Sequence, residues 1–181
     1  SGIVSDPAPP RVLWIRAVSV GETRAAEPLI KALQTRHPEH RILLSHGTPT
    51  GRHTGVDLFG DRVERCYLPY DFGWAARRFL RRFRPVVGVF VETEIWPNLI
   101  RASVQSAVPV YLVNARMSQK SARGYRRVGR LTRDALSKLS GIGAQTDRDA
   151  QRLANLGAAD VRTTGNIKFD RLAPAEMLAL G

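Results

Sequence analysis

The sequence predicts an α/β fold, an open, doubly wound and mostly parallel sheet with helices on both faces. Short apolar runs alternate with helical patterns along the whole chain. One run, residues 86–91, contains only Val, Gly and Phe, which is typical of a strand buried on both faces. Because strands that alternate with helices are joined by crossover connections, we expect a parallel sheet. Ligands of such sheets bind at the carboxyl ends of the strands.

In the first half of the chain, we expect strands at 12–15, 41–45, 63–68 and 86–91. Ala25, Ala26, Leu29, Ile30 and Leu33 recur at helical spacing and predict a helix that runs to about residue 34, before Pro38. A turn-rich segment at 47–51 precedes a short helix at 52–59. A strongly basic helix covers 72–83 and is stopped by Pro85.

The second half continues the same alternation. Pro97 is placed as in the first turn of a helix, which predicts a helix at 97–106. Strands follow at 108–113, 142–145 and 161–164. A long helix is expected at 121–139, and another at 147–156 that is closed by Gly157.

The 181 residues are sufficient for one domain, which we place at 12–170. Residues 1–11 contain three prolines and are interpreted as a linker or ragged edge, and residues 171–181 as a tail or the start of an interdomain linker. The chain is interpreted as a piece of a longer protein. No apolar run reaches the ~18 residues of a membrane span, and no secretory signal is found. A single cysteine, Cys66, excludes an internal disulfide and is interpreted as a buried apolar residue.

The net charge of +12 indicates an anionic partner, namely nucleic acid, an anionic membrane or a phosphorylated substrate. Two arginine-rich stripes follow the predicted helices at 72–83 and 121–139. They are either solvated faces or basic surfaces for lipid headgroups. Nucleic acid would use the same charges, but no recognition motif is present and few aromatic side chains are expected to be exposed.

The segment after the first strand, residues 19–22, ends in Gly21 and Glu22. Gly21 permits a tight turn, and Glu22 falls in the first turn of a helix that faces the ligand edge. The carboxylate either complements the helix dipole or acts as a general base. No GxGxxG motif is present, so the sequence offers little support for dinucleotide binding.

Two carboxylates, Glu92 and Glu94, follow the fourth strand. In an extended chain they point the same way. A carboxylate there must be paired or solvated, so each either forms an ion pair with an arginine or serves a ligand site.

Further polar residues follow the fifth and last strands. Arg116 suits anion binding, and Ser118 and Ser121 supply hydroxyl donors or cap the following helix. Lys168 either reaches an anion or carboxylate in the site or is a solvated surface residue. The four histidines lack a convincing metal-ligand spacing, so we predict no metal.

Taken in order, the strand-end motifs resemble the N-terminal domain of the 3-deoxy-D-manno-octulosonic acid (Kdo) transferases of Gram-negative bacteria. The motifs are WIRAVSVGE at 14–22, TPTG at 48–51, LPYD at 68–71, ETEIWPN at 92–98, VNAR at 113–116 and TGNIKFD at 164–170. Each motif alone is modest, but the ordered set is specific. The resemblance covers about 12–170.

The resemblance implies the Rossmann-like, acceptor-binding half of an inverting, metal-independent GT-B glycosyltransferase that needs no cofactor. The acceptor would be a bisphosphorylated lipid A precursor, and CMP-Kdo would bind a C-terminal domain absent from this chain. The enzyme would lie at the cytoplasmic face of the inner membrane, with the family's anchor also absent here. The alternatives are half of another GT-B glycosyltransferase or of a nucleotide-sugar epimerase, or a basic module that binds nucleic acid or a membrane surface.

The resemblance also implies roles for particular residues. Glu22 matches the catalytic base, Glu92 a second critical carboxylate and Lys168 a catalytic lysine. The expected substrate-binding residues are Ser19, Gly21, Thr48, Thr50, Glu94, Asn114, Arg116, Ser118 and Ser121. The helix N-terminus should lower the pKa of Glu22, whereas Glu92 or desolvation could raise it. Arg16 stands where the family often has His, and no role is assigned to it.

Overall fold

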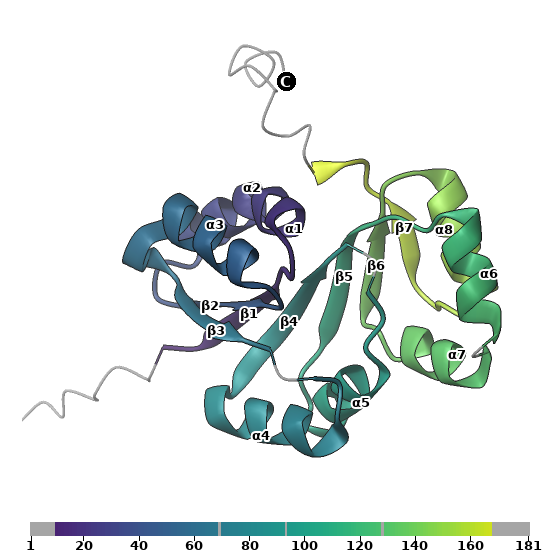
Figure 1. Ribbon diagram of the computed structural model, residues 1–181, viewed down its shortest axis with the longest axis horizontal. Helices are drawn as coiled ribbons and strands as arrows, with labels where there is room; N and C mark the ends of the chain where they lie inside the picture. The colour runs from purple at the N-terminus through teal and green to yellow at the C-terminus, as the bar shows by residue number, and fades with distance from the viewer. Residues whose placement is uncertain (1–9, 69, 93, 128, 168–181) are drawn as a thin grey trace, which may run out of the picture.

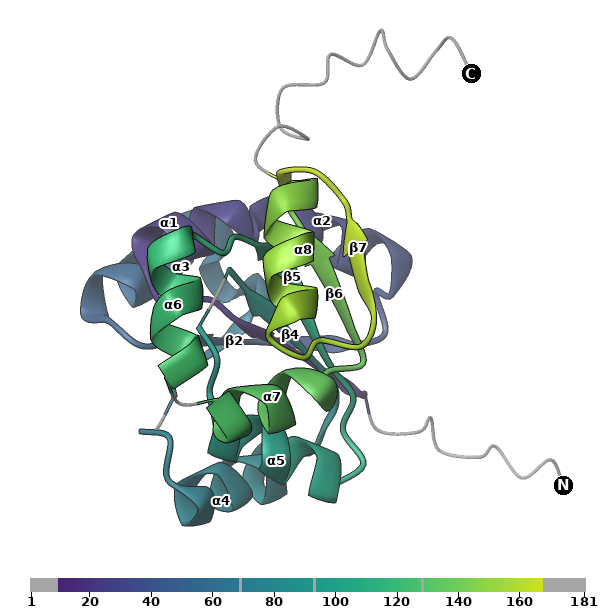
Figure 2. The same cartoon turned by 90° about the vertical axis from the view of Figure 1, so that its right-hand side faces the viewer.

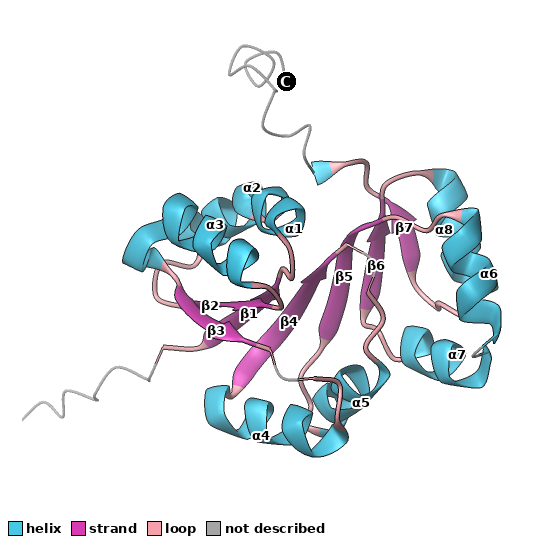
Figure 3. Ribbon diagram, in the orientation of Figure 1, coloured by secondary structure: helices cyan, strands magenta, loops and turns pink. Residues whose placement is uncertain are grey.

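Seven parallel strands form one twisted sheet in the order β3-β2-β1-β4-β5-β6-β7, which is continuous in Figure 3. The computed structural model describes residues 10–68, 70–92, 94–127 and 129–167. The strands are β1 (Val12–Arg16), β2 (Arg41–His46), β3 (Glu64–Tyr67), β4 (Pro85–Val91), β5 (Val110–Ala115), β6 (Gly141–Ala144) and β7 (Val161–Thr163). The predicted fold class is confirmed. Apart from Pro10 and Arg11, the predicted linker and tail lie outside the described residues.

Eight α-helices and one 3₁₀ turn connect these strands within the described residues. They are α1 (Val20–Ala25), α2 (Glu27–Arg36), α3 (Pro49–Phe59), η1 (Gly60–Arg62), α4 (Gly73–Phe83), α5 (Pro97–Gln105), α6 (Gln119–Arg127), α7 (Gly129–Ser137) and α8 (Asp147–Asn155). In Figure 1, α1–α3 gather beside β1–β3, whereas α4 and α5 lie across the sheet from them. Figure 2 shows α4, α5 and α7 grouped at one end of the molecule.

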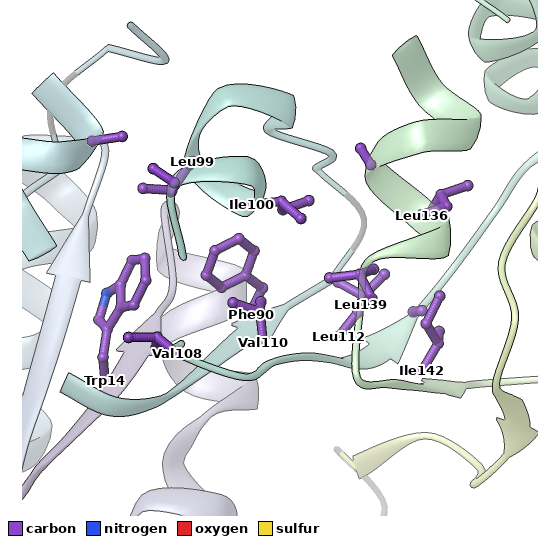
Figure 4. Close-up of a cluster of buried hydrophobic side chains, with 14 of the residues drawn as sticks. Trp14, Phe90, Leu99, Ile100, Val108, Val110, Leu112, Leu136, Leu139 and Ile142 are labelled. Atoms are coloured by element: carbon purple, nitrogen blue, oxygen red, sulfur yellow. The ribbon is translucent and has the colours of Figure 1, made fainter. Parts of the chain in front are cut away.

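The core is divided by the sheet into two clusters. The larger includes Trp14, Phe90 and Leu136 and packs beneath α4, α5 and α7, as Figure 4 shows. The smaller includes Ile15, Leu44 and Phe59 and packs beneath α1–α3. Trp14 and Ile15 are consecutive in β1, so their side chains point to opposite faces of the sheet. Trp14 belongs to the larger cluster and Ile15 to the smaller one. Strand alternation thus explains why helices must cover both faces.

Three predicted elements differ from the structure in a way that has a local cause. The helix expected to run to residue 34 is two helices that meet at Ala26. Pro28 has no amide hydrogen to donate to the carbonyl of Arg24, so a continuous helix loses that bond. The short helix expected at 52–59 begins at Pro49 because Thr48 caps it.

The long helix expected at 121–139 is likewise two helices, α6 and α7. Gly129 begins α7 and is a poor helix former. The Thr132 hydroxyl donates to the carbonyl oxygen of Tyr125 at 3.1 Å and so links the two helices. Burial of the fourth strand on both faces holds only in part, because Val86 at its start is exposed.

Candidate functional site

The carboxyl ends of β1 and β4 lie side by side at the centre of the sheet. The strand order runs from β1 to β2 and β3 on one side and from β4 to β5, β6 and β7 on the other. In open α/β sheets, ligands bind beyond the strand ends at such a switch point, where the connections leave in opposite directions. We call the group Arg16, Ser19, Glu22, Thr48 and Glu94 the switch-point site.

Glu22 lies in the first turn of α1, as predicted, and is buried there. Ser19 caps the helix, since its hydroxyl oxygen accepts from the Glu22 amide at 3.3 Å and the hydroxyl donates to Glu22 Oε1 at 3.1 Å. Glu22 Oε2 accepts from the backbone amide of Val18 at 2.7 Å. The reciprocal bonds resemble a capping box and hold the carboxylate in one orientation.

Thr48 brings the second predicted segment to the same place. Its hydroxyl accepts from the Gly51 amide at 3.1 Å, caps α3, and donates to the carbonyl oxygen of Val18 at 3.1 Å. A Cβ on Gly51 would lie 2.7 Å from that carbonyl oxygen, so a side chain cannot be placed there without movement. Thr50 lies beside Thr48, with their hydroxyl oxygens 3.4 Å apart, and is exposed.

Arg16, to which sequence analysis assigned no role, is the most buried charged residue of the site. Its side chain has no exposed surface, and Nη2 donates to Glu94 Oε2 at 2.6 Å. Trp96 Nε1 donates to the same oxygen at 3.1 Å, and the Trp96 ring lies 4.4 Å from the guanidinium carbon. Glu94 therefore forms the ion pair that sequence analysis left open. A charged residue in an otherwise apolar strand was the signal for Arg16.

The charges of the site shift two pKa values. Burial raises the pKa of Glu22, and Glu94 adds to this, whereas the Val18 amide bond and the Arg16 charge lower it. Burial also lowers the pKa of Arg16, and Glu94 opposes this change. Of the two directions that sequence analysis left open, the pKa of Glu22 is therefore raised, because loss of solvation outweighs the hydrogen bonds from Val18 and Ser19 and the Arg16 charge. The neighbouring carboxylate that raises the pKa is Glu94.

The expectation that Glu92 and Glu94 point the same way assumed an extended chain, which the structure does not have at Glu92. Glu92 has φ 61°, in the left-handed region, so the chain is not extended where β4 ends. Asn114 at the end of β5 has a similar conformation, with φ 55°. Its Oδ1 accepts from the amide of Ile167 at 3.2 Å, which fixes the chain after β7.

The remaining predicted residues lie farther along the same edge of the sheet. Ser118 accepts from the Ser121 amide at 3.1 Å and donates to the Ser121 hydroxyl at 2.9 Å, so Ser118 caps α6. Arg116 is exposed after β5. Lys168 lies outside the described residues, directly after Ile167. The structure therefore unites Ser19, Glu22, Thr48 and Glu94, and places Arg116, Ser118 and Ser121 beyond β5.

Asp71 is another residue that sequence analysis did not assign. Its two carboxylate oxygens accept from the amides of Asn98 and Leu99 at 3.2 and 2.8 Å, at the N-terminus of α5. Its charge also acts on Arg16. Asp71 thus joins the loop before α4 to the segment that holds Glu94 and Trp96.

That loop and α4 carry several exposed aromatic and basic side chains. Tyr70, Phe72 and Trp74 are 82%, 57% and 64% exposed, and the Phe72 and Trp74 rings lie parallel with centroids 6.5 Å apart. The exposed arginines of α4 follow them, namely Arg77, Arg78, Arg81 and Arg82. We call these seven residues the aromatic–basic surface. The expectation that few aromatic residues are exposed is wrong, because these three precede or begin α4 instead of facing the core.

Within the described part of the chain, no helix is long and apolar enough to cross a membrane. The same residues contain no group of three or more His, Cys, Asp or Glu side chains placed to hold a metal ion.

The fold and the position of the site define a class, the Rossmann-like half of a GT-B-like protein. UDP-GlcNAc 2-epimerase from Neisseria meningitidis matches 94% of this chain and 51% of its own, with a TM-score of 0.66 and 15% identity. Acinetobacter baumannii MurG matches 87% of this chain and 45% of its own, with a TM-score of 0.58 and 10% identity. These likenesses show the fold alone.

The family is shown by sequence. A family model described as 3-deoxy-D-manno-octulosonic-acid transferase (kdotransferase) matches residues 2–171, and the chain belongs to this family. It is 44% identical over 174 residues to the 3-deoxy-D-manno-octulosonic acid transferase of Bordetella pertussis and 37% identical over 172 residues to that of Haemophilus influenzae. The matches cover 93% and 94% of this chain but 40% of each relative. The resemblance read from the motifs is confirmed.

Proposed function

We propose that this chain is the acceptor-binding half of an inverting, metal-independent glycosyltransferase that moves Kdo from CMP-Kdo to a bisphosphorylated lipid A precursor. The observation that carries the proposal is the buried, doubly hydrogen-bonded Glu22 at the switch point of a chain that belongs to the Kdo transferase family. CMP-Kdo would bind the part of the relatives that this chain does not match.

Glu22 is the proposed catalytic base. An acceptor hydroxyl would attack the anomeric carbon of Kdo, a new C–O bond would form as the bond to CMP breaks, and the proton would pass to Glu22. A raised pKa makes a carboxylate a stronger base, and the bonds from Val18 and Ser19 orient it. The alternative is that Glu22 has only a structural role and stabilises the N-terminus of α1. That role does not require the loss of solvation that Glu22 undergoes.

The other residues of the proposed site serve binding and charge balance. Glu92 would shape the electrostatic field, and Lys168 would offset negative charge near the donor. Ser19, Gly21, Thr48, Thr50 and Glu94 would line the acceptor crevice around Glu22. Asn114, Arg116, Ser118 and Ser121 would extend it along the strand ends, where Arg116 suits an acceptor phosphate.

A matched pair of substitutions tests the catalytic part of the proposal in the full-length transferase. Glu22→Gln should lower kcat by about 10²–10⁴-fold, because an amide cannot take the proton. Glu39→Gln, at an exposed carboxylate in the α2–β2 loop, should leave kcat unchanged. Retention of most activity by Glu22→Gln would remove the base assignment.

A titration of the 181-residue chain, followed by backbone amide NMR shifts, tests the binding part. We expect a bisphosphorylated lipid A precursor in neutral detergent to shift Gly21, Glu22 and Arg116, and CMP to shift none of them. If CMP alone moved the strand-end amides, the chain would be the nucleotide-binding half, as in an epimerase-like alternative.

We also propose that the aromatic–basic surface rests on the anionic cytoplasmic face of the inner membrane. Exposed aromatic rings suit the headgroup region, and the arginines beside them suit anionic lipid. With vesicles that contain phosphatidylglycerol, Trp74→Ser should weaken binding several-fold. Val56→Ser, an exposed apolar residue of α3, should not weaken it.

The same surface could stack the bases of a single-stranded nucleic acid, which is the binding-module alternative. A single-stranded oligonucleotide therefore forms the second arm of the experiment. Oligonucleotide binding that is tighter than vesicle binding at the same salt concentration, and that is lost in Trp74→Ser, would contradict the membrane assignment.

A further inference from the structure

The guanidinium of Arg16 is buried at the switch point with only part of its hydrogen-bonding capacity used. Nη2 is held by Glu94, whereas Nε and Nη1 are buried without a hydrogen-bond partner among the described residues. Buried polar groups are nearly always paired, so such unpaired donors require an explanation. Besides Glu94, the charges of Glu22 and Asp71 act on the guanidinium.

Direct contact between Arg16 and a ligand does not fit the geometry. The side chain has no exposed surface, and the Trp96 and Phe90 rings lie 4.4 and 5.4 Å from its guanidinium carbon. The Glu94 side chain, in contrast, is 49% exposed. Arg16 therefore acts through the neighbouring carboxylates and not on the ligand itself.

The charged groups that act at this place come from four segments. Arg16 lies on β1, Glu22 on α1 and Glu94 in the segment before α5, while Asp71 acts on Arg16 from the loop before α4. Glu22 has two charged neighbours of opposite sign, Arg16 and Glu94. Without the cation, Glu22 would face a second carboxylate in a site that already excludes solvent, which favours a proton on Glu22.

We propose that Arg16 is a positioning residue, whose buried guanidinium holds Glu94 against Trp96 and supplies the positive charge that keeps Glu22 ionised. Only the catalytic meaning of this charge rests on the proposed function, in which Glu22 is the base. The effect of Arg16 on the protonation of Glu22 does not depend on it. A neutral side chain at position 16 would leave the two carboxylates uncompensated. Arg16 thus opposes the effect of burial on Glu22.

The test is an NMR titration of the Glu22 side-chain carboxyl carbon in the 181-residue chain, assigned with Glu22→Gln. In Arg16→Met, the proton affinity of Glu22 should rise by about threefold or more, because the charge is lost while an unbranched side chain still fills part of the space. In Glu94→Gln it should fall, because the like charge is removed. Arg16→Lys should restore most of the wild-type affinity.

Opposite shifts in the two variants would not arise from a merely structural role. The proposal would be overturned if the titration midpoint of Glu22 were unchanged in folded Arg16→Met, or if it rose in Glu94→Gln. If Arg16→Met does not fold, Glu94→Gln and Arg16→Lys decide. The Glu22→Gln activity assay in the full-length enzyme is independent: an active variant removes the base, whereas unchanged titrations remove only the role of Arg16.

Discussion

His46, the last residue of β2, is fully buried, and its Nδ1 lies 3.1 Å from the carbonyl oxygen of Ala17. Burial lowers its pKa from 6.5 to about 4. As the pH falls below 6.5, the unfolded chain therefore binds this proton before the folded protein does, and stability is lost down to about pH 4. We expect a loss of about 3 kcal/mol from this residue between pH 7 and pH 4.

Urea denaturation at several pH values between 7 and 4 checks this, with His46→Asn as the control. The variant keeps a donor for Ala17 but cannot titrate, so its free energy of unfolding should fall less steeply. Glu22 contributes with the opposite sign, because a raised carboxyl pKa favours the folded state at low pH, and it is present in both proteins. If the free energy of unfolding fell equally steeply with pH in both proteins, His46 would be accessible to protons in the folded chain.

Cys66 is the only cysteine of the chain, so its reactivity can be read without ambiguity. Burial raises the pKa of its thiol from 9.0 to about 12, and the Glu64 charge adds to this. The thiolate is the reactive form, so alkylation by iodoacetamide at pH 8 should be about 10³-fold slower in the folded chain than in urea. The structure places Cys66 only partly buried, packed against the large core cluster, and similar rates would contradict that packing.

At the scale of elements, two helical glycines offer a matched comparison. Gly51 in α3 packs against the backbone of Val18, whereas a Cβ on Gly124 in α6 would meet nothing within 4 Å. Gly51→Ala should cost about 1–3 kcal/mol by overpacking, and Gly124→Ala should gain up to about 1 kcal/mol from helix propensity. Thermal unfolding measures both. A stable Gly51→Ala would mean that the loops after β1 and β2 separate easily.

The elements also show how far sequence reasoning reaches. The alternation of apolar runs with helical patterns was enough to predict the fold, because crossover connections leave few topologies. Helix ends were less predictable. Pro28 and Gly129 divide two expected helices. Each of these residues is also tolerated in the first turn of a helix, so the sequence alone does not show whether a helix ends before it or begins there.

The site was predictable where a residue follows its strand in sequence, as Glu22 and Glu94 do. Arg16 and Asp71 were missed because their partners, Glu94 and the N-terminus of α5, lie 78 and 27 residues away along the chain. The direction of the Glu22 pKa shift stayed open for a related reason. Burial depends on which elements cover a residue, and a local rule such as the helix dipole does not contain that information.

At the scale of the whole molecule, the sheet determines how the protein unfolds. The two core clusters share β1, β2 and β4, and Trp14 and Ile15 alternate between them in the central strand β1. Loss of either cluster exposes one face of the strands that the other cluster also needs. Neither cluster is therefore expected to stay folded without the other. We therefore expect one cooperative transition in urea, with coincident far-UV circular dichroism and tryptophan fluorescence. The fluorescence is measured in a Trp74→Phe/Trp96→Phe background, so that it reports Trp14.

Two substitutions, one in each cluster, test this coupling. Leu136→Ala in the large cluster and Leu44→Ala in the small one should each cost about 2–5 kcal/mol, because both side chains are fully buried. Both should lower the midpoints of the two signals together, although Trp14 belongs only to the large cluster. If Leu44→Ala moved the circular dichroism transition and left the Trp14 transition in place, the β1–β3 side would be a separate folding unit. The switch-point site, which lies between β1 and β4, would then depend on the contact between two units and not on one continuous sheet.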